Sequence, residues 1–291
     1  MRIAIPGSNG KLGRAVVERL TRDGHEVVGF DRSGPAGSTF TRVDLLDYGQ
    51  TLDAMLGVTA RHEGVDALVH LAAIPVNGLV PDATTFHNNL TVSFNVMFAA
   101  QRAGVRTIVA ASSITAMGFP FDEPPPYLPV DEGFTAANNT YGLAKVLEEA
   151  MFAQLVRWQE STSITALRFT NVVGEDEYDS FARADDPSYR RDLLGSYLDV
   201  RDGAELVALA LAHARPGLET YVAAAPDSGL EIPSRELAAQ WCPGVELRHP
   251  LGEYESLVSS EKARRELGFE ARHLWRDEYR GRNDTMRKGT S

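Results

Sequence analysis

Along the first 171 residues, short apolar runs alternate with longer segments in which apolar residues recur every three or four positions. The short runs predict buried strands, and the longer segments predict amphipathic helices. The expected strands are residues 2–6, 26–31, 39–44, 67–72, 107–111 and 163–169. The expected helices between them are residues 12–20, 48–63, 85–103 and 141–159. Strands that alternate with helices form βαβ units, so the pattern predicts an α/β fold, a doubly wound parallel sheet with helices on both faces.

The pattern is less regular after residue 171. Residues 174–191 are polar, acidic and irregular, and we expect them to form a flexible segment over a site. Further helices are expected at residues 202–214, 234–241 and 260–267, and further strands at residues 220–224 and 246–249. The sequence thus predicts a dinucleotide-binding domain over residues 1–171 and a smaller mixed α/β substrate lobe over residues 172–291, with some of its segments returning to the main sheet. The residues from about Gly281 are polar and are expected to fray.

The composition is that of an ordinary globular protein, with 43% hydrophobic and 24% charged residues. Lys and Arg number 29 against 40 Asp and Glu, and the resulting net charge of −11 disfavours binding to nucleic acid or to anionic lipid. The single cysteine, Cys242, excludes an internal disulfide and suits a reducing compartment. No run reaches the roughly 20 apolar residues of a membrane helix, and a strand that starts at Arg2 leaves no room for a signal peptide. We therefore expect a cytoplasmic protein. The seven histidines lack metal-ligand spacing, so no metal site is expected.

A glycine-rich loop, residues 7–13 (GSNGKLG), separates the first strand from the first helix. Glycines there allow positive φ and let the backbone approach a pyrophosphate, which then lies at the positive end of the helix. In a Rossmann fold, an acidic residue about 20 positions later binds the adenosine ribose, and Asp31 has that place. Its charge would repel a 2′-phosphate, so NAD is favoured, while the adjacent Arg32 leaves NADP as an alternative. Asp44, after the third strand, could bind the adenine amino group or cap the next helix.

Tyr141 and Lys145 are four residues apart, so their side chains lie on one face of the expected helix. A phenol with its usual pKa of about 10 is a poor base near neutral pH. A lysine ammonium beside it, together with the positive charge of a nicotinamide, would favour the phenolate. Ser113 lies just after the fifth strand, at the sheet edge where such folds bind ligands, and its hydroxyl could hold a reacting oxygen. The three residues suit acid/base catalysis. Taken alone, a Tyr and a Lys at this spacing are more often surface residues without a catalytic role, and that is the alternative.

Several further motifs follow the glycine loop in a fixed order: Asp44-Leu45, HLAA at 70–73, Asn89 with Asn95, Ser112-Ser113, Tyr141 with Lys145, RFTNVVG at 168–174 and DVRD at 199–202. In this combination the sequence resembles an extended short-chain dehydrogenase/reductase of the NAD-dependent epimerase/dehydratase type. The segment KARRELGF at 262–269 is similar to the closing helix of that family.

The resemblance implies a role for each matching residue. Tyr141 would be the acid/base, Lys145 would bind the nicotinamide ribose and tune Tyr141, and Ser113 would polarise the reacting oxygen. The implied cofactor-binding residues, besides Tyr141 and Lys145, are Gly7, Asn9, Gly10, Lys11, Leu12, Asp31, Arg32, Asp44, Leu45, Leu71, Ala72, Ala73 and Asn89. The implied substrate-binding residues are Ser113, Thr115, Asn171 and Arg191. For Asn89 and Asn171, a buried amide with a purely structural role is the alternative.

The sequence departs from parts of the family in ways that narrow the reaction. Members that dehydrate sugar nucleotides carry an Asp-Glu pair after the Ser/Thr, and Ile114-Thr115 can supply neither acid nor base. Sugar-nucleotide enzymes usually show Tyr-Gly in place of Met117-Gly118. Only 117 residues (291 − 174) follow Gly174, which is short for a lobe that binds a nucleoside diphosphate sugar.

Short members of the superfamily include the uronate dehydrogenases, which this chain resembles in the segment Tyr189-Arg190-Arg191. There an arginine is expected to clamp a substrate carboxylate, although a solvated pair that balances Asp185 and Asp186 is the alternative. The chain differs from them after the catalytic Ser, where they carry Asn-His.

The leading hypothesis is an NAD-dependent oxidoreductase that acts on a small sugar, sugar acid or related polyol. A nucleotide-sugar 4-epimerase or 4-reductase with tightly bound NAD is the enzyme alternative, and a dinucleotide-sensing regulator is a remote one. The helices expected at residues 85–103 and 141–159 correspond to those through which this superfamily commonly dimerises, so a homodimer is also expected.

Overall fold

The computed structural model describes residues 1–34, 37, 39–58 and 61–279 of the chain. The expected fraying from Gly281 onward lies outside these residues. Within the described part of the chain, no helix has both the length and the apolar character that crossing a membrane requires.

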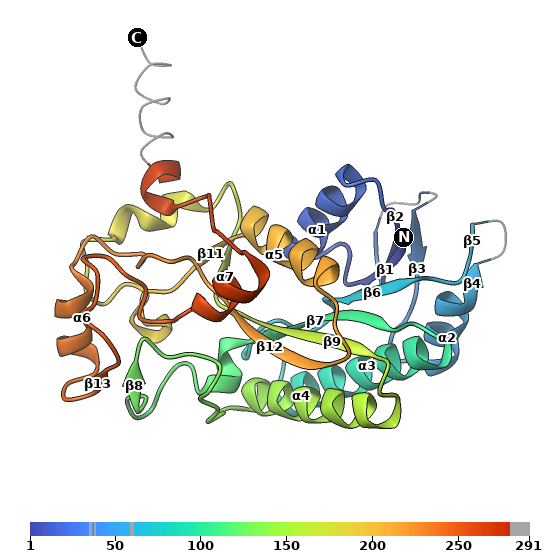
Figure 1. Ribbon diagram of the computed structural model, residues 1–291, viewed down its shortest axis with the longest axis horizontal. Helices are drawn as coiled ribbons and strands as arrows, with labels where there is room; N and C mark the ends of the chain where they lie inside the picture. Colours follow the sequence, from blue (N-terminus) through green and yellow to red (C-terminus); the bar gives the residue numbers. More distant parts are fainter. Residues whose placement is uncertain (35–36, 38, 59–60, 280–291) are drawn as a thin grey trace, which may run out of the picture.

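Seven strands form the central sheet, and every neighbouring pair is parallel (Figure 1). From one edge to the other they are β12 (Gly217–Ala223), β9 (Ser163–Phe169), β7 (Thr107–Ser113), β6 (Ala67–His70), β1 (Arg2–Pro6), β2 (Glu26–Asp31) and β3 (Phe40–Arg42). The chain builds the sheet outward from β1 in one direction and then from β6 in the other. The predicted doubly wound parallel sheet is confirmed, and its direction reverses between β1 and β6, where such folds bind ligands.

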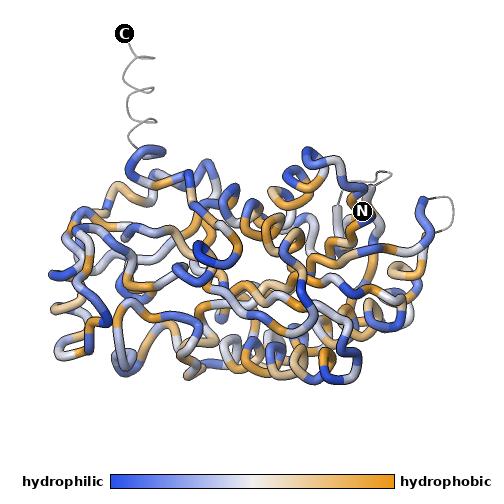
Figure 2. Tube along the Cα trace, in the orientation of Figure 1, coloured by the Kyte–Doolittle hydropathy of each residue, from blue (hydrophilic) through white to orange (hydrophobic). Residues whose placement is uncertain are grey.

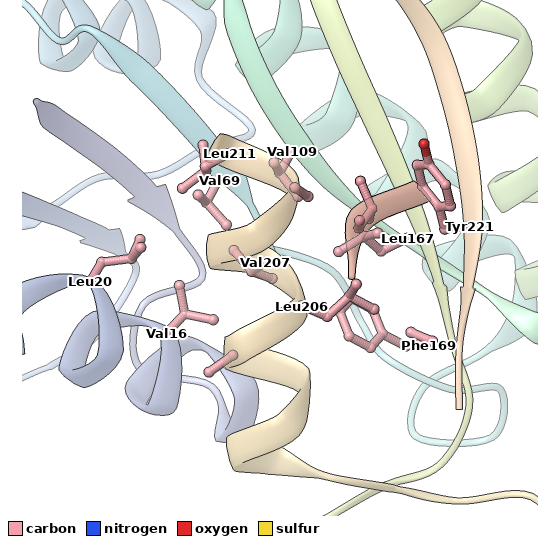
Figure 3. Packing of buried hydrophobic residues seen from close by; sticks show 14 of the residues in the cluster. Val16, Leu20, Val69, Val109, Leu167, Phe169, Leu206, Val207, Leu211 and Tyr221 are labelled. Atoms are coloured by element: carbon pink, nitrogen blue, oxygen red, sulfur yellow. The ribbon is translucent and has the colours of Figure 1, made fainter. Parts of the chain in front are cut away.

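Helices cover both faces of the sheet (Figure 1). One face carries α1 (Lys11–Arg22), α5 (Val200–Ala212) and α7 (Glu261–Leu267), and the other carries α2 (Tyr48–Leu56), α3 (Asp82–Arg102) and α4 (Thr140–Trp158). Because successive strand residues point to opposite faces, Ile3 and Ile5 of β1 pack into the first layer and Ala4 into the second. In Figure 3, Val16 of α1 and Val207 of α5 lie together in the first layer. Figure 2 shows the matching concentration of hydrophobic residues along the sheet.

A smaller lobe is built from segments between and after the sheet strands. It contains the paired strands β8 (Tyr127–Leu128) and β13 (Glu246–Leu247), the paired strands β10 (Val172–Val173) and β11 (Leu198–Asp199), and the helix α6 (Ser234–Trp241). Part of its core is an aromatic cluster in which Trp275 stacks on Phe181, with 5.0 Å between ring centroids, beside Tyr178 and Tyr197. The strand expected at residues 220–224 begins at Gly217 and is the edge strand of the main sheet.

Residues 174–191 include the 3-10 helix η2 (Tyr178–Arg183), and a second one, η3 (Arg191–Leu193), follows. The segment is irregular, as expected. Its aromatic residues Tyr178 and Phe181 are nevertheless fully buried in the lobe, so the segment is part of the packed core.

The helix expected at residues 48–63 was wrong in its second half. The helix α2 ends at Leu56, and the chain then forms the short antiparallel strands β4 (Gly57–Val58) and β5 (His62–Glu63). Gly57 has φ of 150°, and a Cβ at this position would lie 2.8 Å from the carbonyl oxygen of His62. A side chain is therefore disfavoured at this turn, and Gly57 ends the helix.

Candidate active site

The glycine loop between β1 and α1 is closed so tightly that two of its glycines leave no room for a side chain. A Cβ on Gly13 would lie 2.1 Å from the carbonyl oxygen of Gly7, and one on Gly7 would lie 2.6 Å from the amide nitrogen of Ala72. Gly10 begins α1 without any side-chain cap. The first amides of this 12-residue helix are thus not capped by a side chain, and the loop has the shape and polarity that suit a pyrophosphate.

Most of the predicted cofactor-binding residues line one pocket beside this loop. They are Gly7, Gly10, Asp31, Arg32, Asp44, Leu45, Leu71, Ala72 and Ala73. Asp31, at the end of β2, accepts hydrogen bonds from the backbone amides of Asn9 at 3.2 Å and Arg32 at 2.8 Å. These contacts fix the carboxylate at the rim of the pocket, between the glycine loop and the end of β2.

The helix-capping role that the sequence left open for Asp44 belongs to Asp47. Asp47 is the N-cap of α2 and accepts a hydrogen bond from the Gln50 amide at 3.0 Å, which lowers the pKa of its carboxyl. The carboxylate of Asp44 accepts a hydrogen bond from the nearby Leu46 amide, at 3.1 Å. The helix-capping alternative for Asp44 was therefore wrong, because that cap is three residues later.

Three other predicted cofactor residues, Lys11, Leu12 and Asn89, are not among the described residues that line this pocket. The ammonium of Lys11 bridges to the lobe, where it donates to Glu177 at 2.5 Å and to the carbonyl oxygen of Val172 at 3.1 Å. Leu12 packs against the sheet core. Asn89 is buried, and its amide makes two hydrogen bonds with the backbone of Ile74, at 2.8 and 3.0 Å. Asn89 therefore ties the loop after β6 to α3.

Tyr141 and Ser113 meet because α4 starts very close to the end of β7. The approach depends on Gly142, where a Cβ would lie 2.5 Å from the carbonyl oxygen of Thr115. The helix begins at Asn139, whose side chain accepts a hydrogen bond from the Gly142 amide at 2.8 Å. This packing brings the Tyr141 hydroxyl close to Ser113, which acts to lower the pKa of the phenol. The two predicted catalytic hydroxyls are thus adjacent at the carboxyl edge of the sheet.

Lys145 lies one helical turn further along α4, and its Nζ is 5.8 Å from the centre of the Tyr141 ring. Burial raises the pKa of the Tyr141 phenol, and the Lys145 ammonium opposes that rise. Burial acts to lower the pKa of Lys145, but the charge and hydrogen bond of Glu148, together with Tyr141 and Glu149, outweigh it, and the pKa of the ammonium is raised. The site therefore holds a protonated phenol next to a charged lysine.

The lobe carries two of the predicted substrate residues, Asn171 and Arg191. Asn171 accepts a hydrogen bond from Arg190 at 2.9 Å, and the Arg190 guanidinium stacks 4.4 Å above the ring of Phe181. The neighbouring Arg191 is exposed. Both arginines and Asn171 line a cavity of about 560 Å³. Thr115 has a buried hydroxyl without a hydrogen-bond partner among the described residues.

The alternative interpretation of the two arginines, as counter-ions of nearby aspartates, does not hold for Asp186. That carboxylate pairs with Arg183 at 2.7 Å, and bonds from Ser188 and Arg183 lower its pKa to about 2. The sequence singled out Arg191 as the clamp, whereas the structure brings Arg190 to Asn171. Arg190 has φ of 54°, so the backbone turns sharply between the two arginines.

Two acidic residues of the site were missed from the sequence. Glu148 forms a buried ion pair with Lys145, and Glu149 pairs with Arg168 at 2.7 Å and accepts a hydrogen bond from Ser112 at 2.6 Å. Both follow Lys145 at the spacing that brings helical side chains together, three and four residues, and this spacing was the available signal. Across the described residues, no three His, Cys, Asp or Glu side chains gather as metal ligands would.

Known proteins share both the sequence pattern and the architecture. The NAD dependent epimerase/dehydratase family matches residues 3–224. The UDP-glucose 4-epimerase of Bacillus subtilis (strain 168) is 29% identical over 191 residues, which are 60% of this chain and 53% of that protein. The dTDP-6-deoxy-L-talose 4-dehydrogenase (NAD(+)) of Aggregatibacter actinomycetemcomitans is 25% identical over 223 residues, which are 69% of this chain and 77% of that protein. The chain spans about half the length of the 4-epimerases that it matches.

A solved structure of a short-chain dehydrogenase/reductase superfamily protein from Agrobacterium tumefaciens, with bound NAD, is similar over nearly all of both chains. It is 25% identical, covers 100% of this chain and 99% of its own, and has a TM-score of 0.70. The family match extends from the first strand through the end of the sheet, and the fold agrees with it. The chain therefore belongs to the NAD dependent epimerase/dehydratase family.

Proposed function

We propose that this protein is an NAD-dependent oxidoreductase that transfers a hydride between a small sugar, sugar acid or related polyol and the nicotinamide. The observation that carries the proposal is the buried contact between Tyr141 and Ser113, with Lys145 one turn away, beside a glycine cradle. The phenol of Tyr141, which can exchange a proton, the hydroxyl of Ser113, which can bind an oxygen, and the ammonium of Lys145, which acts on the pKa of the phenol, then lie at one edge of the sheet. Such a set suits removal of a hydroxyl proton as the adjacent carbon is oxidised.

The residues around the glycine loop fit a dinucleotide. The loop amides and the first turn of α1 would hold the pyrophosphate, and Asp31 would accept hydrogen bonds from the adenosine ribose. A carboxylate at this position repels a 2′-phosphate, which supports NAD as the cofactor in preference to NADP. When bound, the cofactor supplies the hydride acceptor or donor.

The proton chemistry belongs to the protein. Ser113 would hold the reacting oxygen of the substrate by a hydrogen bond, and Tyr141 would take the hydroxyl proton during oxidation or return it during reduction. Because burial keeps the phenol protonated, Tyr141 becomes an effective base only when positive charge next to it favours the phenolate. Lys145 supplies part of that charge.

Arg190 is the stronger candidate for binding an acidic substrate. Its guanidinium is held by Asn171 and by the ring of Phe181, and it lines the cavity on the lobe side of the site. Its Nε donates to Tyr189 and its Nη1 donates to Asn171 and Ser196, which fixes the guanidinium and leaves Nη2 to donate to a substrate carboxylate. This arrangement supports a uronate-like sugar acid as the substrate.

Replacement of the two arginines separates their roles. Arg190→Ala is expected to raise the KM for a uronate by roughly 10- to 100-fold, the effect of losing a hydrogen bond to a charged group, and Arg191→Ala is expected to raise it less. The measurement is KM for a uronate and for a neutral sugar, which serves as the control because it has no carboxylate. A larger effect of Arg191→Ala would make Arg191 the clamp, and equal losses for both substrates would show a structural role.

The test of the function is NADH formation across a panel of free glucuronate, free galacturonate, neutral sugars and UDP-sugars, each with NAD and with NADP. NADH formed from free sugars or uronates supports the proposal, and a strong preference for NADP would contradict the role of Asp31. A second function, nucleotide-sugar 4-epimerisation, is favoured by the similarity to the 4-epimerase of Bacillus subtilis. That function predicts that a UDP-sugar is isomerised without net formation of NADH, and that the free sugars yield no NADH.

We also propose that the protein forms a homodimer through α3 and α4, which lie side by side (Figure 1). Large apolar side chains are exposed on both helices: Phe94 at 45%, Leu143 at 45% and Leu147 at 40%. Leu147→Glu is expected to convert a dimer into a monomer, as measured by size-exclusion chromatography with light scattering. Leu247→Glu is the control, because Leu247 is equally exposed, at 40%, but lies on β13 in the lobe. A monomeric unaltered protein would contradict the proposal.

A further inference from the structure

The side of Lys145 that faces away from Tyr141 contacts a buried carboxylate. The ammonium donates to Glu148 at 2.8 Å, and only 3% of the lysine side chain and 2% of the glutamate side chain are exposed. It also donates to the carbonyl oxygen of Ala111 in β7 at 3.0 Å. An ammonium has three N–H groups, so these two bonds leave one for the Tyr141 side. The pair therefore determines where the remaining N–H group points.

Two polar side chains lie behind Glu148 in the protein interior. Ser93 on α3 is close enough to act on the pKa of the Glu148 carboxyl, and the Ser93 oxygen lies 3.1 Å from Nε2 of His70 on β6. Nδ1 of His70 has no hydrogen-bond partner among the described residues.

Few charged groups face this carboxylate. Lys145, Tyr141 and Glu149 lie on its own helix, and His70 faces it from the sheet. Burial, followed by the charge of Lys145, lowers the pKa of His70 to about 3, so this imidazole is neutral near pH 7. Glu149 is paired with Arg168. Lys145 is thus the cation that balances Glu148, and Glu148 is the anion that acts on both Lys145 and Tyr141.

We propose that Glu148 is a positioning residue whose buried carboxylate holds the Lys145 ammonium in place and sets the electrostatic balance at the Tyr141 hydroxyl. Its consequence for the reaction rests on the proposed function, but its effect on the two neighbouring groups exists in the cofactor-free protein. Glu148 also partly cancels the charge of Lys145, so that the phenol depends on a second positive charge before it ionises.

The sign of the effect follows from charge alone. A nearby negative charge stabilises the ammonium and destabilises the phenolate, and it therefore raises the pKa of both Lys145 and Tyr141. Removal of that negative charge therefore lowers the pKa of both Lys145 and Tyr141. A residue that only filled space would reduce activity at every pH without moving either group.

Glu148→Gln keeps the size of the side chain and an acceptor for Lys145 while it removes the charge. Tyr141 can be followed by NMR in cofactor-free protein with ¹³C-labelled tyrosine, its signal identified by its loss in Tyr141→Phe. We expect the pKa of Tyr141 to fall by about one unit or more. In the holoenzyme, both limbs of the pH profile of kcat/KM should move to lower pH. Glu160→Gln is the matched control, because it removes the same charge from an exposed residue beyond the end of α4 and should move neither.

An unchanged pKa of Tyr141 in folded Glu148→Gln protein would overturn the proposal. If that variant does not fold, Glu148→Asp is the alternative test. Its side chain is shorter by one methylene group, so the carboxylate lies further from Tyr141, and the pKa of Tyr141 should fall by a smaller amount. A lowered pKa without NADH formation from any substrate would support the role of Glu148 while contradicting the proposed oxidoreductase. NADH formation together with an unchanged pKa of Tyr141 would support the proposed oxidoreductase while contradicting the role of Glu148.

Discussion

Tyr141→Phe is expected to reduce kcat by ~10²–10⁴-fold while the dissociation constant for NAD changes little. The substitution removes only the hydroxyl that exchanges the proton, and the aromatic ring stays buried against α4 and the end of β7. Orientation of the two bound reactants would still supply part of the rate, so some turnover should remain. The measurements are steady-state NADH formation and NAD binding by titration.

Tyr127→Phe is the matched control for this experiment. It also removes one phenolic hydroxyl, which donates to Asp131 at 2.8 Å in the lobe, away from the proposed site. Its turnover should be close to that of the unaltered protein. Full turnover in Tyr141→Phe would exclude Tyr141 as the acid/base.

Gly13→Ala is expected to weaken NAD binding by about 100-fold or more and to lower the free energy of unfolding by roughly 1–3 kcal/mol. The added Cβ would lie 2.1 Å from the Gly7 carbonyl oxygen and 2.9 Å from backbone atoms of Ser8. Backbone atoms cannot turn aside as a side chain can, so the loop or the start of α1 must move, and the pyrophosphate cradle moves with it. Isothermal titration calorimetry and urea denaturation give the two quantities.

The corresponding control is Gly252→Ala, in which the new Cβ would lie 3.5 Å from the side chain of Glu255, an ordinary contact. We expect neither NAD affinity nor stability to change appreciably. Wild-type NAD affinity in Gly13→Ala would mean that the dinucleotide does not bind on this loop.

The layered architecture could be predicted because it depends on patterns that are local in the chain. Apolar runs such as Ile3–Ile5 and Ile164–Leu167 are buried on both faces, as strands of a parallel sheet must be. The end of α2 at Leu56 could not be predicted, since the apolar spacing that indicated a helix over residues 48–63 continues past that residue. The only local sign of the break is Gly57, and a glycine can also lie inside a helix at modest cost.

The same distinction applies to the site. Tyr141, Lys145 and Ser113 could be brought together from the sequence, because helical spacing and strand ends determine their places. Glu148 could not be predicted as a buried residue, since an acidic residue on a helix usually faces solvent, and its burial depends on α3, which packs against α4. The choice between Arg190 and Arg191 depends on a backbone turn that the sequence does not reveal.

The position of β12 has a consequence for how the chain is made. This strand is the edge of the nucleotide-binding sheet, yet it follows residues 172–199, which build part of the lobe, and it pairs in register with β9 along its whole length. During synthesis, the sheet therefore stays open at β9 until the lobe segment and α5 have left the ribosome. Pairing across such a separation is slow to form, and the exposed edge of β9 is a place where another chain could pair. A nascent chain that stalls before β12 should thus be prone to aggregation, although it already contains the complete glycine loop.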